Sequence, residues 1–258
     1  IVIFANDIAY EIVLKLQGIG VAEVIQKPLI SRFNDPEYSK NFIAKIRAHA
    51  VNSSSHEIKN NKGSRNSKGE QIKIVVMGAS TGGPEAVRTV LSALPPDFPV
   101  PIALVQHIET RFAEGYAEWL DGHCKLRVKT AVDGEVPKPG VVYVASGNAH
   151  LVVSGKKLIL DTGLHIKNQR PAVEKLFQSA AESYGPAVMG VILTGMGSDG
   201  ADGAATLRKS GGHMIVQDET TSFINGMPKA AIEAGGASLI LPLQEIAPAM
   251  EEAVYAHR

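Results

Sequence analysis

The stretch that decides the fold reads IKIVVMGASTGGPEAV and occupies residues 72–87. Its first part, residues 72–77, is a mostly apolar run, which favours a β-strand buried on both faces of a parallel sheet. A helix-like segment begins at Pro84, and Ser80 lies between the two among glycines. A serine at such a strand-to-helix turn is held out as an exposed nucleophile. The glycines suit strained backbone angles and a close approach of substrate to the main chain.

The chain after residue 70 alternates apolar runs with helical segments. Strands are expected at residues 72–77, 102–105, 187–193, 214–216 and 238–241, and helices at residues 85–94, 113–120, 172–184 and 201–210. Short strands at residues 141–145, 151–154 and 158–160 are separated by turn residues, a pattern typical of hairpins. The alternation predicts an α/β fold with a doubly wound sheet.

The sequence predicts three parts, at residues 1–50, 51–70 and 71–258. Residues 52–69 contain almost no apolar side chains, so they cannot bury enough surface to offset the entropy of ordering. We therefore expect a flexible linker there. Residues 1–50 contain two strand–helix units, with strands at residues 1–4 and 21–25, too few to close a parallel sheet alone. The missing initiator Met suggests that the chain is part of a longer protein.

The composition excludes several classes of protein. Lys plus Arg and Asp plus Glu both total 26, so a net charge of zero argues against a general nucleic-acid binder. No apolar run approaches the roughly 20 residues that span a bilayer, and no signal peptide precedes the first strand, so membrane insertion is not expected. Cys124 is the one cysteine, which rules out an internal disulfide and suits a reducing, cytoplasmic location.

Serine, histidine and aspartate side chains follow three of the expected strands. Ser80 comes after the first strand, Gln106 and His107 come after the second, and Asp199 lies in TGMGSDG, residues 194–200. Because the carboxyl ends of parallel strands meet at one edge of a sheet, these side chains should lie close together. A hydroxyl, a base that titrates near neutrality and an orienting carboxylate are what nucleophilic acyl transfer requires.

Each of these features also has another interpretation. The glycine-rich turn could hold a phosphate, as in a dinucleotide-binding module, although residues 78–83 lack the Gly-x-Gly-x-x-Gly spacing. His107 could be a structural histidine, and Asp199 could cap the helix that starts near Ala201. A non-catalytic signalling scaffold is a further alternative. The spacing of Asp199 and Asp202 fails the pattern of a calcium loop, so no metal site is expected.

At these residues the chain resembles the chemotaxis-type protein-glutamate methylesterases (the CheB family), from about Ile72 to the C-terminus. The motifs that carry the resemblance are GASTGG (78–83), VQH (105–107), Arg170-Pro171, GVILTGMGSDG (190–200) and GMP (226–228). The resemblance implies a mostly parallel sheet with a β-hairpin excursion. Residues 1–50 resemble the C-terminal part of a flavodoxin-like response-regulator receiver domain, in which Lys27, before Pro28, would contact the phosphorylated aspartate. Taken alone, Lys27-Pro28 is also an ordinary strand-ending turn.

The resemblance also assigns roles to residues. Ser80 would be the nucleophile, His107 the general base and Asp199 the orienting carboxylate, without a cofactor. The N–H of Thr81, by the geometry of the turn, and that of Met196, by resemblance, would bind the oxyanion, and Arg170 would bind substrate. The implied substrates are the cytoplasmic helices of methylated chemoreceptors, with glutamine deamidation as a second activity. A histidine kinase would act through a complete receiver in the parent protein.

The chain departs from the family pattern near the expected site. After its histidine the family has Met-Pro-Pro-Gly, where this chain has IETR, residues 108–111. It has Ala145-Ser146-Gly147 in place of Ala-Pro-Gly, and Glu174 in place of the usual aspartate after Arg-Pro. These differences leave Ser80, His107 and Asp199 intact, so they concern substrate preference and not the type of reaction.

Overall fold

The computed structural model describes residues 2–5, 23–26, 43 and 71–256. The chain divides into two compact units, Ile1–Ile58 and Lys59–Arg258. In the first unit, β1 (Val2–Ala5) pairs in parallel with β2 (Glu23–Gln26), close to the strands expected there. Lys27 and the linker expected at residues 51–70 lie outside the described residues, so the interpretations placed on them stay predictions.

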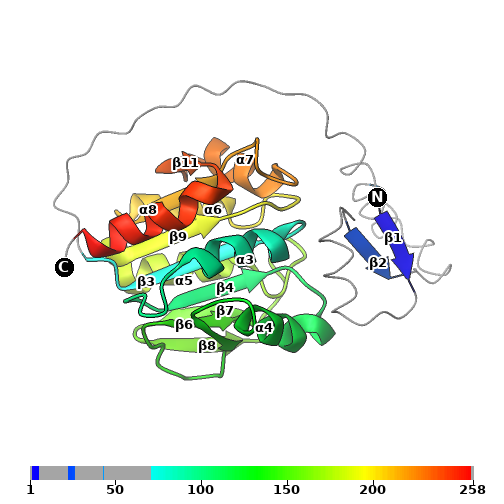
Figure 1. The fold of residues 1–258 in the computed structure, drawn as a ribbon, viewed down its shortest axis with the longest axis horizontal. Coiled ribbons are helices and arrows are strands. Elements are labelled where there is room, and N and C mark those ends of the chain that lie inside the picture. Colours follow the sequence, from blue (N-terminus) through cyan, green and yellow to red (C-terminus); the bar gives the residue numbers. More distant parts are fainter. Residues whose placement is uncertain (1, 6–22, 27–42, 44–70, 257–258) are drawn as a thin grey trace. The chain divides into compact units, whose positions relative to one another are not determined.

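The second unit is built on a parallel sheet of seven strands in its described part (Figure 1). These strands are β3 (Ile74–Ala79), β4 (Ile102–Gln106), β5 (Arg127–Thr130), β6 (Val141–Val144), β9 (Val188–Ile192), β10 (His213–Gln217) and β11 (Leu239–Leu241). Their order across the sheet is β11-β10-β9-β3-β4-β6-β5, and each neighbouring pair is parallel. The predicted α/β class and the mostly parallel sheet are confirmed.

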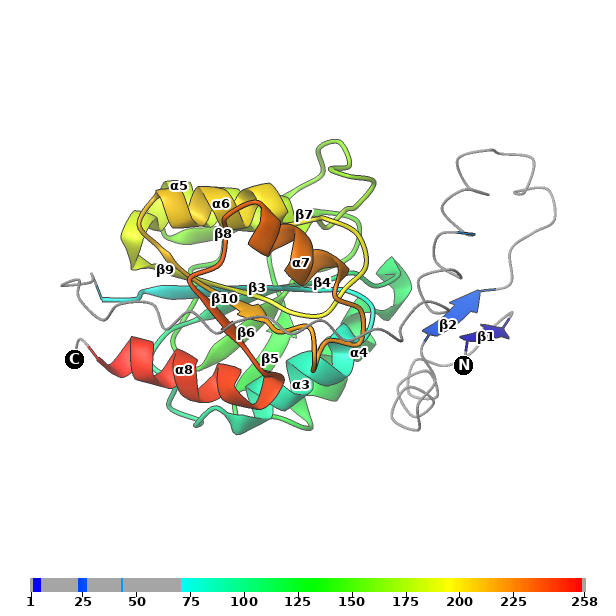
Figure 2. The same ribbon diagram turned by 90° about the horizontal axis from the view of Figure 1, so that it is seen from above.

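Helices cover both faces of this sheet (Figure 2). One face carries α3 (Gly83–Ala93), α4 (Ala113–Asp121) and α8 (Leu243–Tyr255). The other carries α5 (Val173–Tyr184), α6 (Ala201–Lys209) and α7 (Gly226–Glu233), and short 3-10 turns lie at Thr110–Phe112 and Gly185–Ala187. With helices on both sides, the central strands β3, β4 and β9 are buried on both faces, which explains their continuous apolar runs.

The predicted hairpin forms a small sheet of its own. β7 (His150–Ser154) and β8 (Lys157–Asp161) pair antiparallel. The strand expected at residues 141–145 is not part of that hairpin, because β6 enters the main sheet between β4 and β5. Val142, Tyr143 and Val144 are all buried there, so the apolar run reflects a place inside the sheet and not a hairpin edge.

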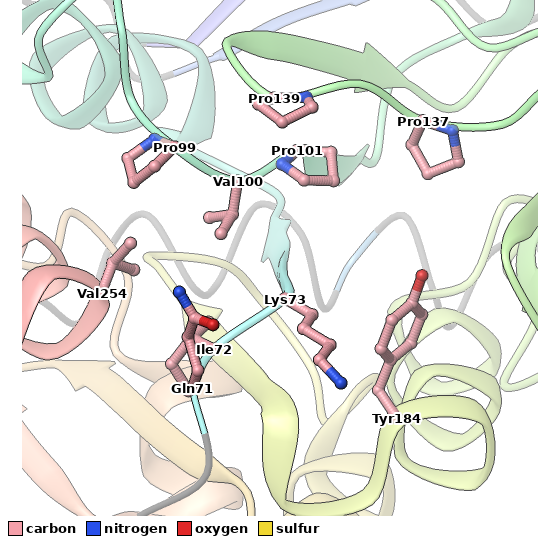
Figure 3. Close-up of a pocket in the computed structure, with 10 residues that line it drawn as sticks. All are labelled: Gln71, Ile72, Lys73, Pro99, Val100, Pro101, Pro137, Pro139, Tyr184 and Val254. Carbon is pink, nitrogen blue, oxygen red and sulfur yellow. The ribbon is translucent and has the colours of Figure 1, made fainter. Parts of the chain in front are cut away.

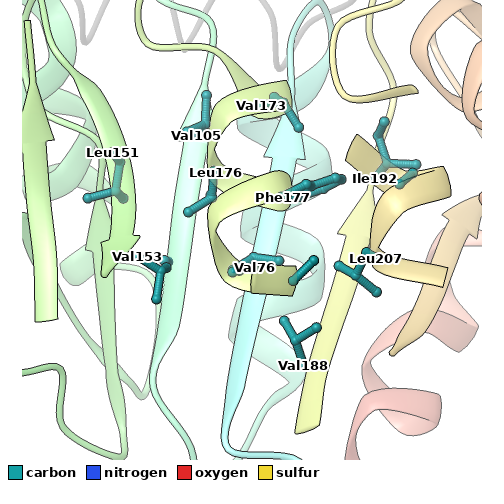
Figure 4. Close-up of a cluster of buried hydrophobic side chains, with 14 of the residues drawn as sticks. Val76, Val105, Leu151, Val153, Val173, Leu176, Phe177, Val188, Ile192 and Leu207 are labelled. Carbon is teal, nitrogen blue, oxygen red and sulfur yellow. The ribbon is translucent and has the colours of Figure 1, made fainter. Parts of the chain in front are cut away.

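The core beneath α5 joins this helix to the centre of the sheet (Figure 4). Val173, Leu176 and Phe177 of α5 are fully buried. They pack in one cluster with Val76 of β3 and Ile192 of β9. Because Val173 is the first residue of α5, this packing fixes the N-terminus of the helix close to the carboxyl ends of the strands.

The chain reverses its direction across the sheet between β3 and β9. From β3 it runs outward through β4 to the edge strand β5 and fills the place between them with β6. It later returns to β9 on the other side of β3. In open α/β sheets, ligands bind in the crevice at the carboxyl ends of the strands at such a reversal. A ligand site is therefore expected among the residues that follow β3, β4 and β9.

Candidate active site

The structure brings His107 and Asp199 into direct contact. His107 directly follows β4, and Asp199 lies in the loop between β9 and α6. His107 Nε2 lies 2.8 Å from Asp199 Oδ2, and the two side chains are only 8% and 4% exposed. A buried carboxylate that accepts from one ring nitrogen places the proton of the neutral imidazole on that atom. Nδ1 of His107 is then the nitrogen available as a base.

Asp199 also caps a helix, but not the helix that its position in the sequence suggests. Its Oδ2 accepts the N–H of Val173 at 2.7 Å and its Oδ1 accepts the N–H of Glu174 at 3.0 Å. These are first-turn donors of α5, whereas α6, which starts at Ala201, has no side-chain cap. The alternative that Asp199 caps the helix near Ala201 is therefore wrong. Helix donors orient the carboxylate that faces His107.

Ser80 lies at the turn between β3 and α3, and its main chain is held by the segment that follows β9. Its N–H donates to Thr194 O at 3.0 Å, and its carbonyl accepts from Gly83 N at 2.8 Å. Thr194 Oγ1 donates to Thr81 O at 3.0 Å. Ser80 Oγ makes no hydrogen bond within the described part of the chain. Hydrogen bonds of a catalytic serine are often long before substrate binds.

The loop at residues 195–197 lies directly against Ser80. A Cβ placed on Gly195 would come within 2.8 Å of Ser80 Cβ, so only glycine permits this approach. Gly195 O in turn accepts from Gly226 N at 3.0 Å and from Met227 N at 2.9 Å, which holds the loop against the start of α7. The N–H groups of Thr81 and Met196 have no hydrogen-bond acceptor among the described residues.

Arg170 connects two loops near the small hairpin. Its Nε donates to Asn148 Oδ1 at 2.9 Å, and its Nη1 donates to the carbonyls of Thr162 and Gly163 at 2.9 and 2.8 Å. The side chain therefore braces the loop after β6 against the loop after β8. Its role in substrate binding stays a prediction.

His150, a residue that sequence reasoning did not single out, supports the N-terminus of α5. Its side chain is buried, and its Nδ1 accepts the N–H of Ala172, the N-cap residue of α5, at 3.1 Å. Its Nε2 lies 2.9 Å from Leu164 O and donates to it, because Nδ1 is the acceptor. His150 is therefore neutral, with its proton on Nε2, and it fixes the helix end that orients Asp199.

Sequence reasoning also did not predict the charged cluster of Lys167, Glu174 and Asp202 near Asp199. Lys167 Nζ donates to Asp202 Oδ2 at 2.9 Å and to Ser198 O at 3.1 Å, and it lies 3.5 Å from Glu174 Oε2. Burial raises the pKa of the Glu174 carboxyl, and the nearby Lys167 only partly offsets this. Burial lowers the pKa of Lys167, but the bond to Asp202 and the charge of Glu174 raise it more. These contacts tie the loop at residues 162–170 to the chain on both sides of Asp199.

No group of three or more His, Cys, Asp or Glu side chains among the described residues could hold a metal ion. None of the helices in that part is both long and apolar enough to cross a membrane. A pocket of about 250 Å³ lies at the opposite, amino-terminal edge of the sheet, and Lys73 and Tyr184 are among the residues that line it (Figure 3). Burial raises the pKa of Tyr184. This pocket contains none of the predicted site residues.

Comparisons with known proteins agree with this architecture. A family model described as CheB methylesterase matches residues 75–250. A protein-glutamate methylesterase/protein-glutamine glutaminase 2 of Burkholderia lata is 47% identical over 179 residues, which are 69% of this chain and 53% of that protein. Protein-glutamate methylesterase FrzG of Myxococcus xanthus is 46% identical over 178 residues, with the same two shares.

A solved structure is similar over the same region. The crystal structure of the Thermotoga maritima CheB methylesterase catalytic domain aligns with a TM-score of 0.68 and 43% identity, over 70% of this chain and 98% of that one. The chain spans about half the length of the curated relatives that it matches. With a matching family model over most of its length and relatives at nearly half identity, the chain belongs to the CheB methylesterase family.

Proposed function

We propose that this chain hydrolyses glutamyl methyl esters on the cytoplasmic helices of chemoreceptors, with Ser80 as nucleophile, His107 as general base and Asp199 as orienting carboxylate. The observation that carries the proposal is the buried contact between His107 Nε2 and Asp199 Oδ2 at 2.8 Å. This pair follows β4 and β9, the strands on either side of β3, which ends at Ala79, directly before Ser80. The names of the relatives supply methyl esters of protein glutamates as the class of substrate. The chemoreceptors as their carriers come from the resemblance to the family.

Acylation begins with attack on the ester carbonyl. Ser80 Oγ bonds to the side-chain carbonyl carbon (Cδ) of the glutamyl ester while His107 Nδ1 accepts the hydroxyl proton. Asp199 stabilises the imidazolium that forms, because its carboxylate already accepts from Nε2. The N–H groups of Thr81 and Met196 would bind the oxyanion, and neither is engaged by the described protein. The proton then passes from His107 to the methoxide, which leaves as methanol.

Deacylation repeats these steps with water. His107 accepts a proton from water, the hydroxide adds to the acyl carbon, and the bond to Ser80 Oγ breaks as the serine is reprotonated. The product is a free glutamate side chain. The same groups would deamidate glutamine if His107 protonates the amide nitrogen, which then leaves as ammonia. No step requires a cofactor.

The proposal places the chain in a cytoplasmic pathway of receptor adaptation. In the parent protein, a complete receiver domain would take a phosphoryl group from a histidine kinase, and Lys27 would be part of that switch. The region from about Ile72 onward would carry the chemistry, because all the proposed catalytic residues lie within it.

The test is methanol release from a methylated receptor fragment. The wild-type chain should release methanol, whereas Ser80→Ala should lower kcat by about 10⁴-fold or more with the fold retained. Thr206→Val is a suitable control, because this residue on α6 bonds only within its own helix. Methanol release by Ser80→Ala at the wild-type rate would refute the proposed nucleophile.

A further inference from the structure

Gln106, the last residue of β4, links the two residues that the proposed mechanism brings together. Its side chain is buried, with 3% exposed. Its Nε2 donates to Ser80 O at 2.8 Å and to His107 O at 3.1 Å. One carboxamide therefore contacts the main chain of both the proposed nucleophile and the proposed base.

The place of Gln106 in the sheet explains why a side chain is needed there. The β3–β4 ladder ends at the pair Ala79 and Gln106, followed by a bond from His107 N to Ala79 O at 2.9 Å. Beyond this point, Ser80 turns into α3 and His107 enters the loop before α4. The Gln106 amide bridges the two segments after the strand pairing has ended.

This arrangement leaves a polar atom unsatisfied. Gln106 Oε1 is buried and has no hydrogen-bond partner in the described structure. The amide cannot be turned over to relieve this, because Oε1 would then face two carbonyl oxygens. Gly83 makes room for the atom, since a Cβ at that position would come within 2.2 Å of Oε1. A buried acceptor without a partner costs folding free energy.

Gln217 provides an internal comparison. It ends β10, is likewise buried, and has both ends of its amide satisfied: Oε1 accepts Thr194 N at 2.8 Å and Nε2 donates to Thr221 O at 2.8 Å. A glutamine at a strand end can therefore be fully satisfied in this fold. Gln106 is not, although its Nε2 makes two bonds at the proposed site.

We infer that Gln106 is a positioning residue, which sets the separation between the turn at Ser80 and the end of β4 before His107. Its Oε1 stays without a hydrogen-bond partner in this arrangement. The inference rests on the proposed function. A shift of about 1 Å between reacting groups is enough to lower a rate about 10²-fold, so a bridge of this kind acts on kcat more than on substrate binding.

The first test is Gln106→Met, which keeps the length of the side chain but removes both the donor and the unpaired acceptor. We expect kcat for methanol release to fall by about 10- to 100-fold with KM nearly unchanged. The melting temperature should stay within about 4 °C of wild type, because the lost bonds are offset by removal of the unsatisfied oxygen. Each rate is divided by the concentration of active sites, which is measured by titrating the protein to completion with a fluorophosphonate.

The control is Ser183→Ala, near the C-terminal end of α5 and away from the N-terminus that contacts Asp199. Ser183 Oγ donates to Val153 O at 3.0 Å and accepts from Gly155 N at 3.2 Å, so the variant also loses two side-chain bonds. It should lower the melting temperature and leave kcat unchanged. An equal loss of kcat in Ser183→Ala would overturn the inference, because any lost bond would then suffice.

The second test is Gln106→Glu. We would measure kcat of this variant and of wild type across a range of pH and take the ratio of the two values. The introduced carboxyl group can donate a hydrogen bond while it is protonated, whereas its ionised form repels the carbonyls of Ser80 and His107. The kcat ratio of variant to wild type should therefore fall as pH rises. A purely structural role would not produce this trend in kcat per titrated site, and the test applies even if Gln106→Met does not fold.

The outcomes separate this inference from the proposed function. Suppose that wild type is labelled at Ser80. If Gln106→Met then keeps kcat within about twofold of the wild-type value, or if the kcat ratio of Gln106→Glu to wild type does not change with pH, the positioning role is refuted and the proposed function is not. If wild type neither releases methanol nor takes the label, the proposed function fails and the inference fails with it.

Discussion

The Asp199 carboxylate has two tasks that a substitution can separate. It accepts from His107 Nε2 and from the first N–H groups of α5. An amide at this position still offers an oxygen to the helix but no longer favours the proton on Nε2. The catalytic and structural tasks should therefore respond differently to Asn and to Ala.

We predict that Asp199→Asn lowers kcat about 10⁴-fold, because the base would be in the wrong tautomer. Asp199→Ala should lower kcat at least as far and also cost about 0.5–2 kcal/mol of stability through loss of the cap. Kinetics and urea unfolding of both variants check this. Equal stability losses for Asn and Ala would argue against the capping role.

Glu174 should make the stability of the protein depend on pH. Burial raises its pKa above the ordinary value of 4.5. The folded state therefore holds this proton more tightly than the unfolded state, and the stability that it contributes is lost as pH rises from 4.5 through the folded pKa. Glu174→Gln stays neutral throughout.

We predict that the melting temperature of Glu174→Gln relative to wild type rises with pH over that window and levels off above it. Scanning calorimetry of both proteins between the acid limit of folding and a pH of about 8 measures the difference. Glu182→Gln, an exposed position on the same helix, is the matched control. A relative melting temperature that falls with rising pH would contradict the account.

At the scale of elements, the N-terminus of α5 is the structure on which the proposed site depends. Asp199 contacts it from the loop after β9, and His150 contacts it from β7. The hydrophobic face of the helix is packed on the central strands. The small hairpin, which carries His150, therefore helps to hold the N-terminus of α5 in place.

We predict that His150→Phe destabilises the fold by about 1–3 kcal/mol, because the buried N–H of Ala172 loses its acceptor. It should also lower kcat, since α5 orients Asp199. His150→Asn restores an acceptor near the position of Nδ1 and should recover part of both losses. Urea unfolding and methanol release measure them, and an Asn variant as impaired as the Phe variant would count against this role.

Sequence patterns located most of the elements around the site but not all of the sheet. The strands β3, β4 and β9 were predictable because they lie in mostly apolar runs bounded by proline, glycine or polar residues. β5 (RVKT) has one buried residue, Val128, and lies at the edge of the sheet, so it lacks such a run. α8 was missed, although Ile246, Ala247, Met250 and Val254 have helical spacing, because Pro248 interrupts the pattern.

Sequence reasoning also placed Ser80, His107 and Asp199 at one edge of the sheet, because parallel strands share a direction. It could not reveal that Asp199 caps α5, since the bonded residues are 25 and 26 positions apart. The same holds for the bonds from Gln106 to Ser80 and from Lys167 to Asp202. Such contacts depend on the register of loops, which local patterns do not encode.

For the whole molecule, the reversal of strand order beside β3 is the central architectural fact. It makes β3, β4 and β9 neighbours, so that their carboxyl ends share the edge where open α/β sheets bind ligands, and the family relationship covers this region. The phosphate-binding alternative would use the same turn at residues 78–83 but would need no base and no carboxylate beside it. The two accounts therefore differ in whether Ser80 is reactive.

Covalent labelling by a fluorophosphonate tests the central claim most directly. Wild type should gain one adduct, mapped to Ser80 by peptide mass spectrometry, and Ser80→Ala should gain none. His107→Ala should react at a rate lower by several orders of magnitude, because the hydroxyl would lack its base. An unlabelled wild type, or a label on another residue that persists in Ser80→Ala, would contradict the account.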